Sequence, residues 1–363
     1  MDDYEQVRGL VDRGRELPDG RARVQVFEQA AKIAENLELH IEYEVKDMLR
    51  HAYYWAGDGD KMLVTSSWCL GVHDEHPDEY DPWSALDILG SALTYVASLD
   101  TISRPQINQL LNDLDHRVSR ANVSRRFALR HHCFNAFWMG DHDHARQLYD
   151  QMWEFPFDEM CDTRPWRQVF RVDFFVHTGQ YGRAVEVLDD AEIADGNDDD
   201  EFARWMNSFA LHALIDQGEW ATAEELHEST YYKLKNNSKY MELVAKHVDY
   251  LTARGDLEAA VSLFARHFLW LAGASTNRQV FEFQLSGLLL TEALLAQAVD
   301  RLQLAAPPEL ELPADVRAGE LAPLHAWLGA QTAHWAKRFN DRNGNDYFDR
   351  IVAERRRLVL ERG

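Results

Sequence analysis

Four glycines recur at a nearly constant spacing in the middle of the chain, and no other feature constrains its fold as strongly. Gly140, Gly179, Gly218 and Gly255 lie 39, 39 and 37 residues apart. An alanine follows each glycine by five positions, and an apolar residue follows that alanine by three. Mostly apolar or small residues stand three and four positions before each glycine, which is the spacing of one helix face. The pattern predicts tandem helix hairpins, in which the glycine ends the first helix and the small alanine lets the second helix pack closely.

The same pattern extends beyond these four copies. Gly57 lies 83 residues before Gly140, about two periods, and we expect a break without glycine between Asp100 and Pro105. A long apolar helix is predicted from about Asn277 to Leu302, then a proline-rich linker over 305–315 and two final helices. No segment alternates every second residue between hairpin turns, so we expect almost no strand.

Hairpins joined by a G-x4-A turn resemble the tetratricopeptide-repeat family, best between Phe127 and Leu271. The period of 37 to 39 residues is longer than the family's period of about 34. The family's tryptophan in the first helix is also replaced here by Leu129, Gln168, Asn207 and Val244. The resemblance implies an all-α fold, a right-handed α-solenoid of antiparallel hairpins over residues 1–272, clearest over 121–272. Residues 273–363 would then form helices that cap the solenoid, and the last helix is polar enough to face solvent.

Charge and composition limit the function classes. The chain has 38 Lys and Arg against 61 Asp and Glu, a formal net charge of −23. Nucleic acid is therefore excluded as the main partner, and a basic peptide or protein surface fits better. The chain has three cysteines and no CxxC pair, which fits a reducing compartment. We also expect no signal peptide. The apolar run over 285–299 is too short for a bilayer and contains Glu292. We expect a cytoplasmic protein without a membrane span.

The family resemblance implies that the first helix of each hairpin lines a concave groove that binds a peptide or a partner helix. Carried over by position, the predicted groove residues are Phe127, Arg130, Phe134, Trp166, Asp173, His177, Trp205, His212, Asp216 and Asp249. Aromatic side chains would anchor a ligand, and carboxylates would accept its Arg or Lys side chains. The alternative is that the aromatic row packs between repeats and that the carboxylates are only solvated.

Three short motifs raise the question of a metal. "DHDH" (141–144) falls on the glycine turn, and its histidines have no counterparts in the other copies, so a turn is the better interpretation. "HDEHPDE" (73–79) is interpreted as a helix end rather than a zinc site. "ADGNDDDEF" (194–202) lacks the glycine and glutamate that a calcium loop requires. We therefore predict no metal, no cofactor and no catalytic residue.

Three functional hypotheses follow. The first is a non-enzymatic scaffold that binds a protein or peptide in an acidic, aromatic groove. The second is a peptide-responsive bacterial regulator that acts on a protein partner. The third is an enzyme with a toroid of helix pairs, in which Asp173, Asp216 and Asp249 serve as acid and base. A homodimer through the terminal helices is also open.

Overall fold

The computed structural model describes residues 2–190, 200–306 and 309–361. Within these ranges the chain is all helical, with one isolated β-bridge between Arg301 and Glu320 and no strand. Consecutive helices pack on one another along the chain, which confirms the expected fold class and is consistent with an α-solenoid. The right-handed superhelix and the capping role of the last helices stay predictions.

The predicted hairpin turns are confirmed at atomic detail. Gly57, Gly140, Gly179, Gly218 and Gly255 all have φ between 71° and 85°, the left-handed region that glycine adopts without steric cost. In each turn the residue after the glycine donates its N–H to the carbonyl five residues earlier, as in Gln180 to Phe175, which is the Schellman arrangement. "DHDH" is accordingly a turn followed by the start of a helix.

An alanine lies five residues after Gly140, Gly179, Gly218 and Gly255, where the two helices of each hairpin pack closely. All four have an exposed fraction of 0%. They are Ala145, Ala184, Ala223 and Ala260. A larger side chain at these positions would hold the two helices of a hairpin apart, which explains the constant spacing between glycine and alanine.

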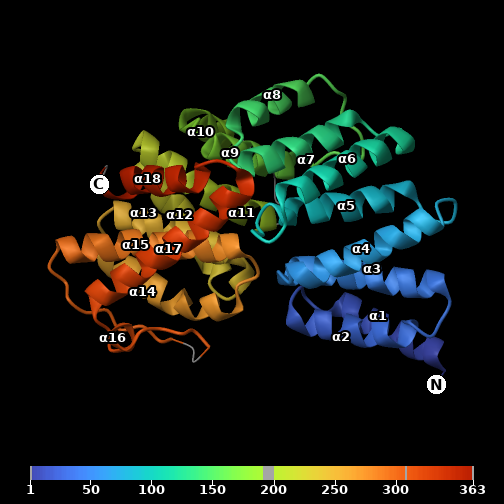
Figure 1. Cartoon of the computed structure of the whole chain (residues 1–363), viewed down its shortest axis with the longest axis horizontal. Helices are drawn as coiled ribbons and strands as arrows, with labels where there is room; N and C mark the ends of the chain where they lie inside the picture. Colours follow the sequence, from blue (N-terminus) through green and yellow to red (C-terminus); the bar gives the residue numbers. More distant parts are fainter. Residues whose placement is uncertain (1, 191–199, 307–308, 362–363) are drawn as a thin grey trace. The chain divides into compact units, whose positions relative to one another are not determined.

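The described chain divides into two compact units. The first unit consists of Met1–Ala97, Arg104–Asn135 and Gln147–Cys161. Its helices are α1 (Asp3–Glu16), α2 (Arg21–Ala34), α3 (Leu39–Ala56), α4 (Gly59–Glu75), α5 (Pro82–Val96), α6 (Arg104–Ala121), most of α7 (Arg125–Trp138) and the end of α8 (His142–Met152). Helices α1 to α6 lie side by side in chain order (Figure 1). The expected break without glycine is present, because α5 ends at Val96 and α6 begins at Arg104.

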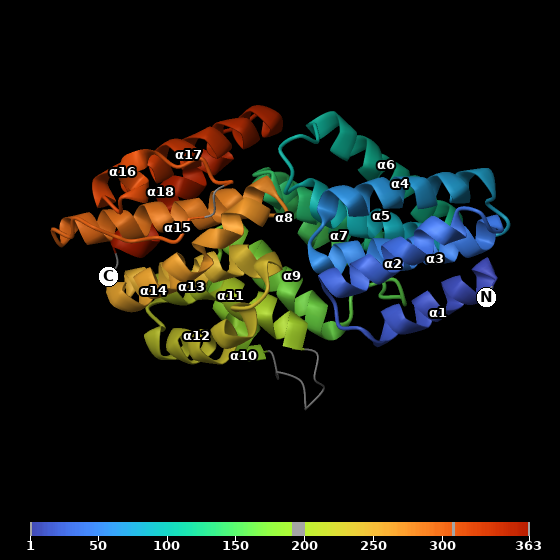
Figure 2. The same cartoon turned by 90° about the horizontal axis from the view of Figure 1, so that it is seen from below.

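The second unit consists of Ser98–Ser103, Ala136–Arg146 and Asp162–Gly363. Its helices are α9 (Arg164–His177), α10 (Tyr181–Asp190), α11 (Asp200–Gln217), α12 (Trp220–Leu234), α13 (Met241–Ala253), α14 (Leu257–His267), α15 (Asn277–Ala296), α16 (Ala314–Arg317), α17 (Leu321–Asn343) and α18 (Tyr347–Leu360), with short 3₁₀ turns at Ser238–Tyr240 and Phe268–Gly273. Helices α15, α17 and α18 form a layer against the α11 and α13 hairpins (Figure 2). Whether residues 273–363 are a domain of their own stays a prediction.

Two helices differ from the sequence-based expectation. Helix α15 ends at Ala296 rather than near Leu302, and Ala298 just beyond it has a positive φ of 58°. Helix α18 was expected to be a polar, solvent-facing helix, but Tyr347, Phe348, Arg355 and Leu358 are buried. Its charged residues are spaced so that one face remains apolar apart from Arg355. That face packs on α11, α13 and α15.

Candidate functional site

The predicted groove carboxylates and histidines of the second unit do not line an open surface. Asp173, His212 and Asp249, each six residues before a hairpin glycine, are buried. Helix α15 packs on α13, helix α18 packs on α11 and α13, and Asp249 is in direct contact with α18. These side chains are therefore not exposed, as a ligand-binding groove would require. Helices α15 and α18 of the same chain pack against the face of α11 and α13 that carries His212 and Asp249, which we call the inner face. Sequence periodicity cannot show this, since it reports only which side chains share a face.

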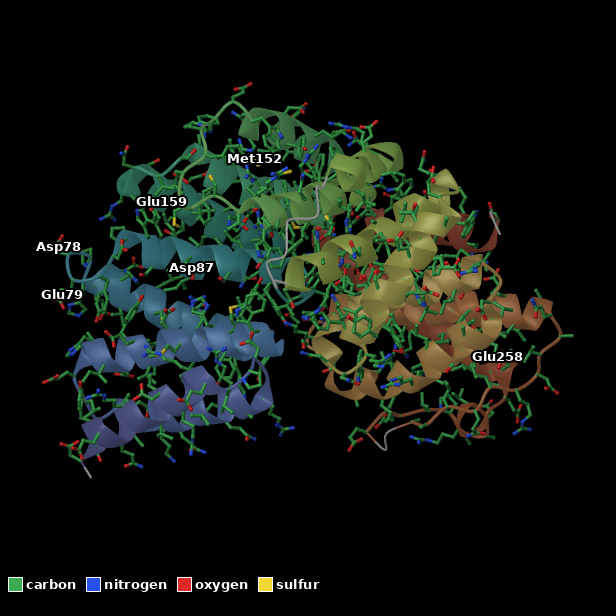
Figure 3. The ribbon with its side chains drawn as sticks, turned by 180° about the vertical axis from the view of Figure 1, so that it is seen from behind. Asp78, Glu79, Asp87, Met152, Glu159 and Glu258 are labelled. Carbon is green, nitrogen blue, oxygen red and sulfur yellow. The ribbon has the colours of Figure 1, made fainter. Side chains whose placement is uncertain are left out.

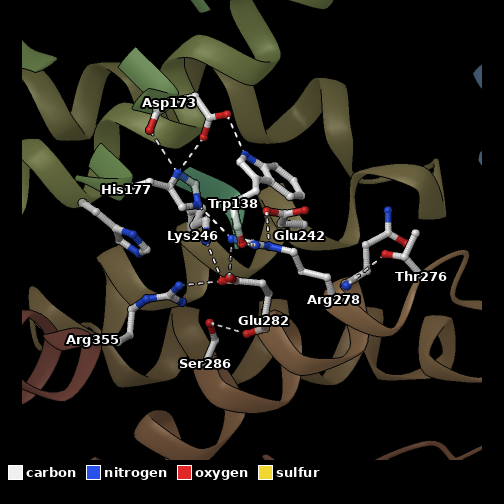
Figure 4. Close-up of polar contacts among 12 residues, drawn as sticks. Trp138, Asp173, His177, Glu242, Lys246, Thr276, Arg278, Glu282, Ser286 and Arg355 are labelled. Atoms are coloured by element: carbon white, nitrogen blue, oxygen red, sulfur yellow. Dashed lines mark hydrogen bonds and ion pairs between the residues drawn. The ribbon is translucent and has the colours of Figure 1, made fainter. Parts of the chain in front are cut away.

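Arg355 of α18 is the centre of this inner face. Its guanidinium donates Nη1–H to Asp249 Oδ2 at 2.8 Å and Nη2–H to Glu282 Oε2 at 2.5 Å. Lys246 Nζ donates to the same Glu282 oxygen at 2.6 Å, and His212 Nε2 donates to Asp249 Oδ2 at 2.8 Å. All five side chains are buried, so the contacts of Arg355 and Lys246 are ion pairs in a medium of low dielectric constant rather than solvated surface pairs. Figure 4 shows Arg355, Lys246 and Glu282 together.

A second group of buried side chains continues the network through Arg278 of α15. Asp173 Oδ2 accepts a hydrogen bond from Trp138 Nε1 at 3.0 Å. Its Oδ1 lies 2.8 Å from His177 Nδ1, but Nδ1 donates its hydrogen bond to the backbone carbonyl of Asp173 at 3.0 Å. Arg278 Nη2 lies 2.8 Å from His177 Nε2. Because a guanidinium can only donate, His177 Nε2 accepts this bond, which places its proton on Nδ1. The guanidinium also lies 4.0 Å from the centre of the Trp138 ring (Figure 4).

Burial and neighbouring charges act in different directions on the ionisable groups of the network. Burial raises the pKa of Glu242, which lies on α13 near Arg278, and lowers the pKa of Lys246. Burial also opposes ionisation of Glu282, but Arg355, Lys246 and Arg278 hold its pKa well below the usual range. Close pairing of carboxyl groups with basic side chains is what permits this many ionisable groups in a protein interior.

The other predicted groove residues have varied surroundings. Asp216 of α11 accepts from Arg357 of α18 at 2.9 Å. Trp205 donates to Glu201 at 3.0 Å, and its ring lies against Phe209 and Tyr240, which favours the alternative that this aromatic packs between repeats. Trp166 is half-buried.

The three groove positions predicted on α7 belong to the first unit. Phe127 packs edge-on against His131, with the ring centres 4.8 Å apart. The Arg130 guanidinium lies 5.8 Å from the centre of the buried Phe134 ring. Phe127 and Arg130 themselves are half-buried, so all three take part in packing on their own helix.

A cavity of about 210 Å³ adjoins the network within the second unit. His177, His212, Lys246, Glu282 and Arg355 form part of its wall. Its described lining does not include the three aspartates of the enzyme hypothesis. His142, the first histidine of "DHDH", lies on this wall, where burial lowers its pKa to about 4. The cavity thus joins histidines from several hairpins without a metal-like cluster.

The motifs considered for metal binding have structural roles where they are described. His73 is buried and hydrogen-bonded to Tyr43 at 2.7 Å, while His76 pairs with Glu79 beside Asp78 in the exposed loop before α5 (Figure 3). The acidic stretch 194–202 lies mainly outside the described residues. Across the described ranges no group of three or more His, Cys, Asp or Glu side chains is arranged to hold a metal ion. None of the described helices combines the length and apolarity that crossing a bilayer requires.

The sequence interpretation missed four charged members of the network, namely Lys246, Arg278, Glu282 and Arg355. These residues lie on α13, α15 and α18, outside the repeated positions that defined the groove. One signal was available: Arg278 and Glu282 are four residues apart in an otherwise strongly apolar helix. Charged residues in such a helix require partners, but the sequence does not say which.

Comparisons with protein-family models, with curated proteins and with solved structures found no match to this chain. Its function therefore has to be inferred from its own side chains.

Proposed function

We propose that this protein is a non-enzymatic helical-repeat adaptor that binds a basic helical segment of a protein or peptide on the inner face of α11 and α13. The observation that carries this proposal is Arg355, whose guanidinium bridges Asp249 and Glu282. Asp249 is a groove position predicted from the repeat. In this structure the chain's own α18 is the occupant.

The contacts of α18 support one class of partner. Arg355 pairs with the buried carboxylates of Asp249 and Glu282. Arg357 pairs with the less buried Asp216 at 2.9 Å. Phe348 and Leu358 supply apolar contact on the same helix face. An amphipathic helix with two arginines and two apolar anchors is thus the ligand class that this face fits, in the manner of helix-in-groove recognition. The protein's net charge of −23 would also attract such a helix.

Occupation by α18 favours the regulator hypothesis as a refinement of the same proposal. A partner helix would have to displace α18, and the released α18 would then be free for a second protein. Binding and release would be coupled because both helices need the same carboxylates.

The test is a fluorescent peptide with the sequence of residues 345–361, titrated into the full chain. The Arg355→Glu variant repels its own α18 from Asp249 and Glu282, so the added peptide should bind this variant and bind the wild type at least tenfold more weakly. A peptide with Arg355→Ala should lose at least tenfold in affinity, because truncating one partner of a buried charge pair costs about 2–5 kcal/mol.

The matched control is the full chain with Arg350→Glu, an exposed position on the same helix that pairs with Asp346. It should bind the peptide no better than the wild type does. Circular dichroism first establishes that every variant is folded. If folded Arg355→Glu protein does not bind the peptide, the inner face is a structural core and the proposal fails.

A further inference from the structure

The cavity beside the ionic network has the size of a small-molecule site. Its volume of about 210 Å³ corresponds to roughly seven water molecules at about 30 Å³ each. Its walls come from α9, α11, α13, α15 and α18 and from residues near the Gly140 and Gly179 turns. Because so many elements contribute, the space is a product of the tertiary fold rather than a gap beside one loop.

The polar side of the cavity has spare hydrogen-bond donors. The ammonium of Lys246 has three N–H groups, and the structure gives it one acceptor, Glu282 Oε2 at 2.6 Å. The Lys246 side chain is only 4% exposed, so bulk water does not satisfy the remaining donors. On the same cavity wall, His142 Nε2 is buried and has no hydrogen-bond partner among the described residues. Such groups cost free energy unless something in the cavity pairs with them.

The carboxylates on the wall are already paired. Glu282 is held by Lys246 and Arg355, and Glu354 accepts from Arg357 at 2.5 Å and from Tyr181 at 3.1 Å. Most of their oxygens therefore already accept hydrogen bonds, and these carboxylates do not require a bound cation. What the cavity lacks is a hydrogen-bond acceptor for the remaining N–H groups of Lys246. An anionic acceptor would interact most strongly with this ammonium.

Another part of the wall is apolar. Val176, Phe209, Ile351 and Leu358 line it, from α9, α11 and α18. An inorganic ion would leave these side chains facing empty or water-filled space. A ligand with a short apolar body would cover them and gain hydrophobic free energy.

We propose that this cavity binds a small organic monocarboxylate whose carboxylate accepts from Lys246 and whose short apolar body lies against Val176, Phe209 and Leu358. The site requires α18 in place, because Ile351 and Leu358 form part of its wall, so a ligand here would stabilise the closed arrangement of α18 whether or not the adaptor proposal holds.

The experiment measures binding to the full chain by calorimetry, with isobutyrate and benzoate as probes. Their uncharged isosteres, isobutyramide and benzamide, are matched in shape, and inorganic phosphate tests the apolar requirement. We expect at least one carboxylate to bind about tenfold or more tightly than its amide, and phosphate not to bind. Equal binding of acid and amide, no binding of either acid, or binding of phosphate alone would each overturn the proposal.

Two variants locate the site. Lys246→Met should weaken carboxylate binding at least tenfold, while the matched control Lys337→Met, at an exposed lysine of α17, should leave it unchanged. Val176→Phe fills the apolar part from α9 without touching the ionic network, so it keeps the test decisive if Lys246→Met does not fold. Unchanged affinity in Val176→Phe, or an equal loss in Lys337→Met, would place binding elsewhere. The adaptor proposal is tested separately by the α18 peptide, so either result can fail without the other.

Discussion

Asp87 in the first unit and Glu282 in the second each receive an arginine, at 2.8 and 2.5 Å, yet their surroundings differ sharply. The Asp87 side chain, on α5 (Figure 3), is 51% exposed, and its partner Arg50 also pairs with Asp47. The Glu282 side chain is 1% exposed and is shared by Arg355 and Lys246. The Arg50 side chain is itself only 1% exposed, so the same helical-hairpin architecture produces an ion pair with one exposed end in one unit and a fully buried network in the other. What differs is that α15 and α18 contribute their own charges to the second.

The largest effect is expected from Glu282→Gln. This change leaves Lys246 and Arg355 without their shared carboxylate in a buried setting, which costs about 3–5 kcal/mol in the free energy of unfolding. Urea denaturation followed by circular dichroism measures it. Glu292→Gln on the same helix, where the side chain is one-third exposed and pairs with Arg356, should cost about 1 kcal/mol or less. Equal costs for the two variants would mean that the network is not buried in solution.

A pair of glycine substitutions tests whether α18 covers the hairpins. Gly140 and Gly255 have similar positive φ values, 85° and 81°, so alanine at either position costs about 1–2 kcal/mol of backbone strain. At Gly140 the new Cβ would also lie 2.3 Å from Cβ of Tyr347 in α18, whereas at Gly255 nothing lies within 4 Å. Gly140→Ala should therefore cost about 1–3 kcal/mol more than Gly255→Ala. Equal values in thermal or urea unfolding would place Tyr347 away from the turn.

The pH dependence of stability sharpens the comparison at His212. Burial lowers its pKa to about 4, while in the unfolded chain the value is about 6.5. Between these values the unfolded state binds a proton that the folded state does not. The contribution of His212 to the free energy of unfolding is therefore fully present above about pH 6.5 and is lost as the pH falls towards 4. His212→Gln keeps a donor for Asp249 and removes the titration. Its stability should therefore fall less steeply, by up to about 1.4 kcal/mol per pH unit.

Unfolding free energies of the wild type and His212→Gln at pH 7.5, 5.5 and 4.5 measure this slope. The exposed position His40 supplies the control, since His40→Gln should leave the wild-type slope unchanged. Identical slopes for all three proteins would show that His212 is not buried as a neutral group.

The smallest effect is expected from Asp87→Asn in the first unit. Arg50 is buried but keeps Asp47 as a partner at 2.8 Å, and the carboxylate that is lost is half-exposed, so the cost should be about 1 kcal/mol. High salt should reduce it further by screening. A cost comparable with that of Glu282→Gln would remove the distinction between the two units.

Local features of the chain were predictable from sequence to a large extent. The hairpin turns at Gly140, Gly179, Gly218 and Gly255, the buried alanines five residues later and the break before α6 all follow from short-range rules. A left-handed residue must end the first helix, and a small residue must stand where two helices meet. The end of α15 was less predictable, because apolar residues continue beyond Ala296 into a turn at Ala298.

The groove was predicted only as a set of positions. The repeat predicted that Asp173, His212 and Asp249 share one face, because residues at equal offsets from successive turns lie on equivalent helix faces, and His212 and Asp249 are in contact. It could not show that this face is buried, since Arg355 is 106 residues from its partner Asp249. No local pattern encodes a contact of that separation.

The sequence by itself determined the all-helical hairpin architecture and the residues that share each helix face, because these depend on interactions within about one helical turn or across one hairpin. Only the tertiary structure decided that α15 and α18 lie on the inner face, which turned candidate ligand-binding carboxylates into a paired ionic core and left a cavity beside them. The physical reason is that the energy of a charge depends on its environment and its partners. Both are set by segments that meet only when the whole unit has folded.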